Sequence, residues 1–174
     1  MFCLEIEKNI VLIGMPGVGK STIGVILAKV MSRNFLDTDI YIQSREGRRL
    51  QEIIDKQGIK SFCEIEENTI LSVSCKNSVI ATGGSVVYSK KAIESLKQFG
   101  ILFYLYLPLS HLKKRLKNIS SRGVVMLHSQ SLEQLFDERL PLYERYADTI
   151  IDCTGKNHEE VINEILFKLK GFSS

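Results

Sequence analysis

The stretch NIVLIGMPGVGKST, residues 9–22, constrains the fold of this chain more than any other. An apolar run over 10–13 is long enough for a short buried strand, and the spacing G-x-x-x-x-G-K-[ST] and a helical pattern over 21–31 follow it. Glycines in such a loop let consecutive backbone N–H groups turn toward phosphate oxygens, because a Cβ would block that path. The N-terminus of the following helix adds its dipole and its unpaired N–H groups. The stretch therefore predicts a phosphate-binding strand–loop–helix unit, and the alternative is a glycine-rich turn that binds no ligand.

Two side chains of this loop suit a magnesium-bound nucleotide. Lys20 can reach the β and γ phosphates. The hydroxyl of Ser21 can hold Mg²⁺.

Length, composition and charge are those of a globular protein that handles small molecules. The 174 residues suit one domain, 1–174, because no internal repeat or low-complexity linker interrupts them. The net charge of +3 is mild and no basic stripe is interleaved with aromatic residues, so we expect no nucleic-acid partner. A local basic site would still suit an anionic small molecule.

The cysteines and the N-terminal residues indicate a cytoplasmic protein. The four cysteines and three histidines are dispersed without a C-x-x-C pair, so metal binding through them is not expected. Reduced thiols are usual in the cytoplasm. The opening MFCLEIEKN carries acids early and lacks a long apolar core, unlike a signal peptide. No apolar run approaches membrane-spanning length, so we expect no membrane partner.

Apolar strand-like runs alternate with helical patterns along the chain, which predicts an α/β fold with a mainly parallel sheet. Gly58 separates two helical patterns, 48–57 and 59–73, and two capping boxes, Ser131 with Gln134 and Asn157 with Glu160, open the last two helices. Strands are predicted at 10–13, 34–36, 79–81, 101–107 and 149–152, the fourth of them central.

Two aspartates follow the second predicted strand. A strand that carries Asp37 and Asp39 at its carboxyl end would present both at the edge where α/β sheets bind ligands. Beside a phosphate-binding loop, this pair suits one acid linked to Mg²⁺ and one acid that reaches a substrate hydroxyl. The alternative is that Asp39 only caps a helix that begins at Ile40.

Two further segments are candidates for the site. Gly83 and Gly84 follow the third strand, where two glycines let the backbone approach a ligand, although a tight turn is the alternative. The polar segment 118–130, which contains Arg122, lies between two helices and is a candidate mobile lid.

With these pieces in order, the chain resembles the shikimate kinase family of P-loop small-molecule kinases. The resemblance rests on GMPGVGKST at 14–22, FLDTD at 35–39, ATGG at 81–84 and ERLPLYERYAD at 138–148. It implies a three-layer P-loop kinase fold with a five-stranded parallel sheet flanked by helices and a mobile lid. It also implies ATP and Mg²⁺ as cofactors. The implied reaction phosphorylates the 3-hydroxyl of shikimate to give shikimate 3-phosphate, in the chorismate pathway of aromatic amino acid biosynthesis.

The resemblance implies a role for each matching residue on the nucleotide side. Ser21 would bind Mg²⁺ and Asp37 would support the metal through water. Arg122 would close with the lid onto the phosphates, and Lys156 would lie beside the adenine. The ATP phosphates would be held by residues of the loop: Gly17, Val18, Gly19, Lys20, Ser21 and Thr22.

On the acceptor side, the resemblance implies that Asp39 binds the acceptor hydroxyls and helps to remove the proton. Gly83 and Gly84 would contact the acceptor through their backbone, and Arg139 would pair with its carboxylate. Lys20, Asp39 and Arg122 would then be the catalytic residues, in a protein that the resemblance implies is a monomer.

The sequence departs from the family pattern at three places. Cys63 stands where the family has an arginine that binds the acceptor carboxylate, Ser85 stands where it has a third glycine, and Gly123 follows the lid arginine in place of proline. Losing a hydrogen bond to a charged group should weaken acceptor binding about tenfold to a hundredfold. That loss is expected unless another cation substitutes, and the candidates are Arg45, Arg48, Arg49 and Lys60.

Three functions therefore stay open at this point. The first is a shikimate kinase, and the second is a related kinase for another hydroxylated small acid, which Cys63 and Ser85 favour. The third is a nucleotide-binding module without turnover, which the lost arginine and the altered lid favour, and against which the intact Lys20 and Asp39 weigh.

Overall fold

The strands of the chain form a parallel five-stranded sheet. The computed structural model describes residues 8–116 and 130–172. In the sheet the strands lie in the order β2-β3-β1-β4-β5 and every neighbouring pair is parallel. The predicted five-stranded parallel sheet is thus confirmed. The strands are β1 (Asn9–Ile13), β2 (Asn34–Asp37), β3 (Ser78–Ala81), β4 (Gly100–Tyr106) and β5 (Thr149–Asp152).

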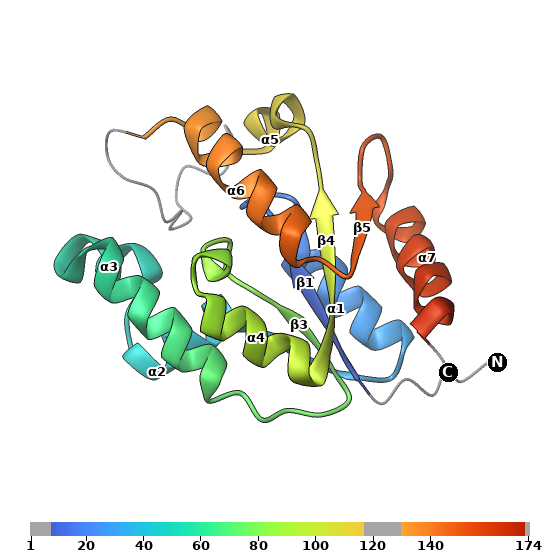
Figure 1. Ribbon diagram of the computed structural model, residues 1–174, viewed down its shortest axis with the longest axis horizontal. Coiled ribbons are helices and arrows are strands. Elements are labelled where there is room, and N and C mark those ends of the chain that lie inside the picture. Colours follow the sequence, from blue (N-terminus) through green and yellow to red (C-terminus); the bar gives the residue numbers. More distant parts are fainter. Residues whose placement is uncertain (1–7, 117–129, 173–174) are drawn as a thin grey trace.

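Helices cover both faces of this sheet (Figure 1). On one face α1 packs on β2 and β3 and contacts α7. On the other face α4 and α6 pack against β4, and α3 packs on α4. The helices are α1 (Lys20–Val30), α2 (Thr38–Glu46), α3 (Leu50–Leu71), η1 (Val86–Tyr88), α4 (Lys90–Phe99), α5 (Leu109–Leu116), α6 (Leu132–Tyr146), α7 (His158–Leu169) and η2 (Lys170–Phe172).

The inner strands are apolar because both of their faces are covered. Every residue of β1 is buried, and so are the first six of the seven residues of β4. Strands covered on both faces read as continuous hydrophobic runs rather than as alternating ones. The long run of β4 was predicted to be the central strand. It is an interior strand, but the middle position of the sheet belongs to β1.

The position of β1 determines where a ligand can bind. From β1 the chain goes to the edge strand β2 and returns to β3, which lies between β2 and β1. It then crosses to β4 on the other side of β1. Ligands of open α/β sheets bind at the carboxyl edge where the strand order reverses in this way. The loop after β1 and the loop after β3 meet at this edge, because β1 and β3 are paired from Ile10–Val79 to Leu12–Ala81.

A smaller group of apolar side chains packs α2 against α3. It consists of Ile42, Leu50, Ile53, Ile54 and Phe62. Helix α3 is kinked at Gly58, whose φ of 82° and ψ of 164° are not helical. Two helical segments on either side of Gly58 were predicted from the sequence, and this prediction is confirmed.

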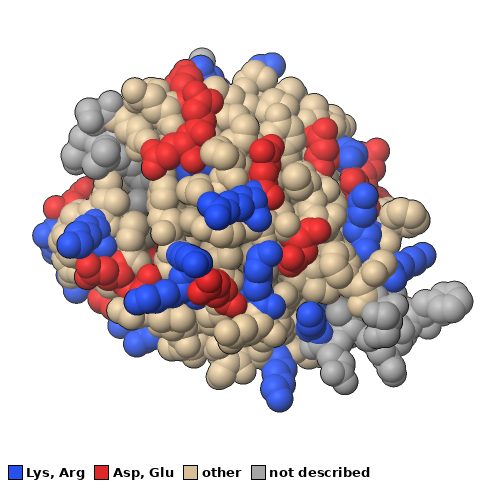
Figure 2. Space-filling model, in the orientation of Figure 1, with Lys and Arg blue, Asp and Glu red and all other residues tan. Residues whose placement is uncertain are grey.

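The surface carries charges of both signs. On the face shown in Figure 2, lysines and arginines are interspersed with aspartates and glutamates, so no single-sign field covers that face. Within the two described ranges, no helix has both the length and the apolar character needed to cross a bilayer.

Candidate active site

The loop between β1 and α1 forms one wall of the site. Gly14, with a φ of 146°, lies so close to β4 that a Cβ would be 2.6 Å from the Leu105 carbonyl oxygen. Gly19 has a φ of 109° and precedes the first residue of α1. The glycines therefore let the chain turn sharply at the N-terminus of a helix, where backbone N–H groups can bind an anion.

Lys20 lies inside this loop. Its Nζ donates hydrogen bonds to the carbonyl oxygens of Gly14 at 2.7 Å and Met15 at 3.0 Å. Burial lowers the pKa of Lys20 to about 8, while the Asp39 carboxylate acts in the opposite direction. An ammonium group that is desolvated in this way gains strongly from a bound anion.

A cavity of about 460 Å³ brings the predicted motifs together. Its walls come from the phosphate-binding loop, the start of α2, the loop after β3, and α6. The predicted site residues that line it are Gly17, Gly19, Lys20, Ser21, Thr22, Asp39, Gly83, Gly84 and Arg139.

A second cavity of about 580 Å³ adjoins the first and shares Ser21, Thr22 and Asp39 with it. It also contains Asp37, so the hydroxyl and the carboxylate predicted for Mg²⁺ face the same space. Mg²⁺ is usually bound by one or two side-chain ligands together with phosphates and water. This donor set fits the predicted metal.

The structure corrects the placement of the two aspartates. Asp37 ends β2, but Asp39 lies in the first turn of α2 rather than on a strand. The residue that caps this helix is Asp37 and not Asp39, because Oδ1 of Asp37 accepts from the N–H groups of Asp39 and Ile40. The strand was predicted at 34–36 and ends at Asp37, so only the extended placement of Asp39 was wrong, because the helix begins at Thr38 directly after the strand.

Gly83 and Gly84 give the site space. A Cβ on Gly83 would collide with Oε1 of Glu66 and lie 2.8 Å from Oδ1 of Asp39. The Gly83 N–H already donates to Thr38 Oγ1 at 3.1 Å, and the Gly84 carbonyl accepts from the Tyr143 hydroxyl at 2.6 Å. These two backbone groups are therefore used within the protein. Glycine is required at position 83 because two carboxylates approach closely, and at position 84 because Arg139 and Pro16 do.

Arg139 is the buried cation of the acceptor half. Its side chain, on α6, is 1% exposed, and its Nε donates to the Tyr88 hydroxyl at 3.0 Å. The guanidinium also lies over the Tyr88 ring, 5.0 Å from its centroid. A Cβ on Gly84 would be 3.0 Å from Arg139 Nη1, so this nitrogen faces the loop after β3.

Next to Arg139, Glu66 forms a buried hydrogen bond with Ser85. Ser85 Oγ donates to Glu66 Oε2 at 2.6 Å, and Glu66 is 2% exposed. Burial raises the pKa of Glu66 to about 7, and the Ser85 hydrogen bond opposes that shift. Cys63, one turn earlier on α3, is half-buried, and burial raises the pKa of its thiol.

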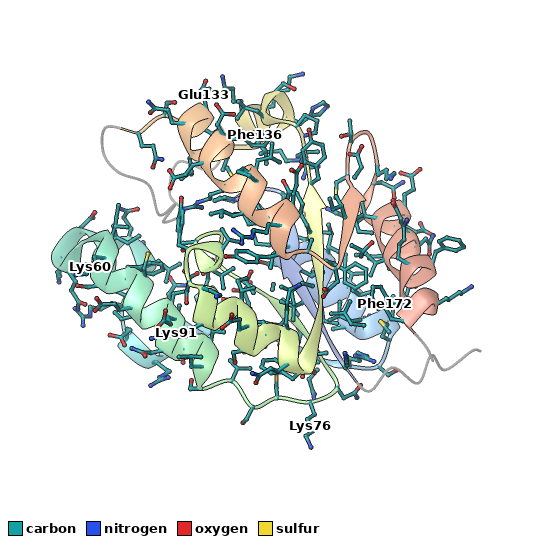
Figure 3. All side chains as sticks on the ribbon, in the orientation of Figure 1. Lys60, Lys76, Lys91, Glu133, Phe136 and Phe172 are labelled. Atoms are coloured by element: carbon teal, nitrogen blue, oxygen red, sulfur yellow. The ribbon has the colours of Figure 1, made fainter. Side chains whose placement is uncertain are left out.

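None of the basic residues proposed as substitutes for the family arginine is among the described residues that line the first cavity. Arg48 pairs with Glu46, and Arg45 lies over the Tyr41 ring. Lys60 is on the outer side of α3 (Figure 3). Arg49 lines the second cavity instead.

Three other predicted residues are placed differently or not described. The Val18 side chain is 1% exposed and its N–H donates to Met15 O at 3.3 Å, so both face the protein. Lys156 bonds to Glu164 Oε2 at 2.5 Å and Asp152 O at 2.7 Å, and it is not among the described residues that line either cavity. Arg122 and residues 118–129 of the predicted lid lie outside the described residues.

Two basic residues that line the first cavity, Arg115 and His158, were not predicted for the site. Arg115 Nη1 donates to Val18 O at 2.9 Å, which ties α5 to the phosphate-binding loop. A signal for Arg115 existed, since it belongs to the basic segment after Pro108, but nothing in that segment distinguishes it from the neighbouring lysines. His158 is the first residue of α7, and its approach to the loop depends on the fold alone.

A phosphate-binding loop at the switch point of a parallel sheet, with a buried lysine and an adjacent carboxylate, defines a P-loop phosphotransferase. The shikimate kinase family model matches residues 16–170. A shikimate kinase of Thermodesulfovibrio yellowstonii is 36% identical, over 96% of this chain and 98% of that protein. One of Clostridium botulinum is 38% identical, over 91% and 94%. The chain belongs to the shikimate kinase family, whose members use ATP and Mg²⁺ to phosphorylate a shikimate hydroxyl.

Solved structures agree with this assignment. The Acinetobacter baumannii shikimate kinase in complex with shikimate has a TM-score of 0.89 and 32% identity, and the comparison covers 97% of this chain and 96% of that one. A gluconokinase from Sinorhizobium meliloti, 18% identical with a TM-score of 0.55, covers 96% and 94% and shares the fold alone.

Proposed function

We propose that this protein transfers the γ-phosphoryl group of ATP to the 3-hydroxyl of shikimate. The observation that carries the proposal is one cavity lined by Lys20 and the N-terminus of α1 as well as by Asp39 and Arg139. A phosphate donor and an anionic hydroxylated acceptor can therefore lie in contact, which is the main requirement of phosphoryl transfer.

On the donor side, the backbone of the loop and the α1 N-terminus bind the phosphate oxygens, and Lys20 neutralises charge on the β and γ phosphates. Ser21 would hold Mg²⁺ directly and Asp37 would support it through water. When bound, the metal adds positive charge at the phosphates.

On the acceptor side, Asp39 orients the reacting hydroxyl and takes its proton. It lies at the same cavity as Lys20, so the hydroxyl that it binds faces the phosphates. Arg139, whose guanidinium is fixed by Tyr88, pairs with the acceptor carboxylate. Gly83 and Gly84 leave room for the acceptor between these groups.

The remaining assignments belong to the same proposal. Residues 1–174 act as one domain and as a monomer in the cytoplasm. The lid, about 118–130, brings Arg122 to the phosphates and excludes water during transfer.

The test measures initial rates of ADP formation with Mg-ATP, with and without shikimate, and locates the phosphate of the product by ³¹P and ¹H NMR. We expect shikimate-dependent ADP formation and a 3-phosphate product. Asp39→Asn should lower kcat by about a hundredfold or more, with the KM for ATP within about twofold. A protein that binds ATP but forms no ADP in response to shikimate would contradict the proposal.

A related kinase for another hydroxylated acid is the second candidate, because Cys63 and Ser85 both lie on the acceptor half of the site. Turnover only at very high shikimate concentration, improved by Cys63→Arg, would favour it.

A further inference from the structure

Glu66 carries a buried oxygen that the proposed mechanism does not use. The side chain is 2% exposed, and its Oε2 accepts from Ser85. Oε1 has no hydrogen-bond partner among the described residues. An unsatisfied buried carboxylate oxygen costs roughly 1–3 kcal/mol or more, so a site that retains one is expected to receive a polar hydrogen from a ligand.

The position of Oε1 indicates which ligand supplies that hydrogen. Oε1 of Glu66 and Oδ1 of Asp39 both lie against Gly83, since a Cβ there would meet these two oxygens first. Gly83 and Asp39 line the cavity, and Arg139 Nη1 faces the neighbouring Gly84. A molecule with a carboxylate for Arg139 and a hydroxyl for Asp39 therefore lies beside Gly83, and Glu66 Oε1 lies directly behind that glycine.

Ser85 compensates for a change elsewhere in the site. In the family pattern an arginine at position 63 would lie one turn before Glu66 on α3 and could pair with its carboxylate, but this chain has Cys63. The hydroxyl of Ser85, which replaces the third glycine of the family, provides the hydrogen bond instead. The two departures from the family pattern thus meet at one carboxylate.

We propose that Ser85 is a positioning residue that holds Glu66 so that Oε1 accepts a hydrogen bond from a non-reacting hydroxyl of the acceptor. This inference rests on the proposed function, because it assumes an acceptor with several hydroxyls. Ser85 itself lines the cavity, and its proposed role is to hold Glu66, whose Oε1 lies directly behind Gly83. Through Ser85 and Glu66, the positions of the acceptor's hydroxyl groups, in addition to its carboxylate, determine which acid is phosphorylated.

The charges that face Glu66 determine how the pair responds to pH. Asp39 from α2 raises the pKa of Glu66, while Arg139 from α6 and Lys20 from α1 lower it. The Ser85 hydrogen bond also lowers it, second only to the opposite effect of burial. Cys63 on the same helix and Tyr143 on α6 also interact electrostatically with Glu66. Removing the Ser85 hydroxyl therefore shifts the Glu66 pKa upward.

Ser85→Ala is the central variant, and Ser89→Ala is its matched control. Ser89 Oγ, at the cap of α4, donates to Oε2 of the next glutamate of α3, Glu67, at the same 2.6 Å. Neither residue is among the described residues that line the two cavities. Both variants lose one serine–glutamate hydrogen bond, and Ser89→Ala also loses a helix cap. Because Ser85 lines the cavity and Ser89 does not, the pH dependence of the rate and the titration of Glu66 are needed to separate an action through Glu66 from a direct contact of Ser85 with the acceptor.

We expect Ser85→Ala to raise the KM for shikimate about tenfold, with the KM for ATP unchanged, since a hydrogen bond to a charged group is lost. Its acid limb of kcat/KM for shikimate should move to higher pH. Ser85→Thr should restore wild-type values within about threefold.

Deoxy analogues of shikimate identify the hydroxyl. For the 4-deoxy or the 5-deoxy compound that lacks the hydroxyl bound by Glu66, the difference in KM between wild type and Ser85→Ala should vanish. An equal effect of Ser85→Ala on shikimate and both analogues, or a KM unchanged by Ser85→Ala, would overturn the proposal.

A ¹³C NMR titration of the Glu66 carboxyl in the absence of acceptor separates this inference from the proposed function. A Glu66 pKa that rises in Ser85→Ala but not in Ser89→Ala supports the Ser85–Glu66 link, and an unchanged pKa overturns it. If the titration shows the link but the wild type has no shikimate-dependent turnover, the proposed function fails, and the assignment of a shikimate hydroxyl to Glu66 fails with it.

Discussion

Asp37 caps the helix that carries Asp39. Oδ1 of Asp37 accepts from the backbone N–H of Asp39 at 3.0 Å and of Ile40 at 3.2 Å. One acid of the FLDTD motif therefore fixes the backbone from which the other reaches the cavity. Because Asp37 also faces the second cavity beside Ser21, its carboxylate has both a structural role and a predicted metal role.

Substitution by serine separates these two roles. Asp37→Ser keeps a side-chain oxygen that can cap α2, whereas Asp37→Ala loses the cap and about 1 kcal/mol of stability. Both variants lose the carboxylate, so both should need about tenfold more Mg²⁺ for half-maximal activity. Urea unfolding and Mg²⁺ titrations of the rate measure the two effects. If Asp37→Ser binds Mg²⁺ as the wild type does, Asp37 serves only as a cap.

Gly83→Ala should impair the acceptor site while leaving the nucleotide site intact. The added Cβ would overlap Glu66 Oε1, a buried carboxylate that has little room to move, and would crowd Asp39. We expect the KM for shikimate to rise more than tenfold and stability to fall by about 1–3 kcal/mol. Gly171→Ala is the control, because a Cβ at that position meets no atom within 4 Å. Equal shikimate kinetics in the two variants would show that the close packing at Gly83 is dispensable.

Features set by neighbouring residues were predictable from the sequence. The phosphate-binding loop lies between a buried strand and a helix as expected, and both capping boxes, at Ser131 and Asn157, form. In each case the interacting groups are three to five residues apart, so the amino acid types alone determine the local structure.

Features that depend on long-range packing were not predictable. The order of the strands, the approach of Arg115 to Val18, and the bond between Ser85 and Glu66 join residues distant in sequence. The motif comparison showed that Ser85 is unusual, but only the fold reveals that its partner is Glu66. The helical placement of Asp39 was missed for another reason, namely that the alternative considered placed the helix cap at Asp39, whereas the cap is Asp37 and the helix begins at Thr38.

Asp148, the last residue of the fourth motif, has a structural role in the described part of the chain. Its Oδ2 accepts from the Leu102 N–H at 2.8 Å, and its Oδ1 accepts from Lys97 Nζ at 3.1 Å. Asp148→Ala should lower the free energy of unfolding by about 1–2 kcal/mol, because an N–H of β4 loses its partner. Lys97→Ala removes only the surface ion pair and should cost less than about 1 kcal/mol. Both variants should retain wild-type kcat, and a large loss of kcat in Asp148→Ala would place this residue in the mechanism.

The burial of Glu66 predicts an unusual dependence of stability on pH. Its pKa is raised from 4.5 to about 7 in the folded protein, so between these values the folded state retains a proton that the unfolded state releases. Glu66 therefore contributes to the free energy of unfolding at low pH. This contribution, up to about 3 kcal/mol, is lost as the pH rises through about 7. Glu66→Gln stays neutral and should lose less stability than the wild type between pH 5 and pH 8 in urea unfolding. Glu67→Gln, which removes the neighbouring carboxylate outside the cavities, should keep the wild-type slope. Identical slopes for wild type and Glu66→Gln would mean that Glu66 is ionised at little cost, and that Lys20 and Arg139 already compensate its charge.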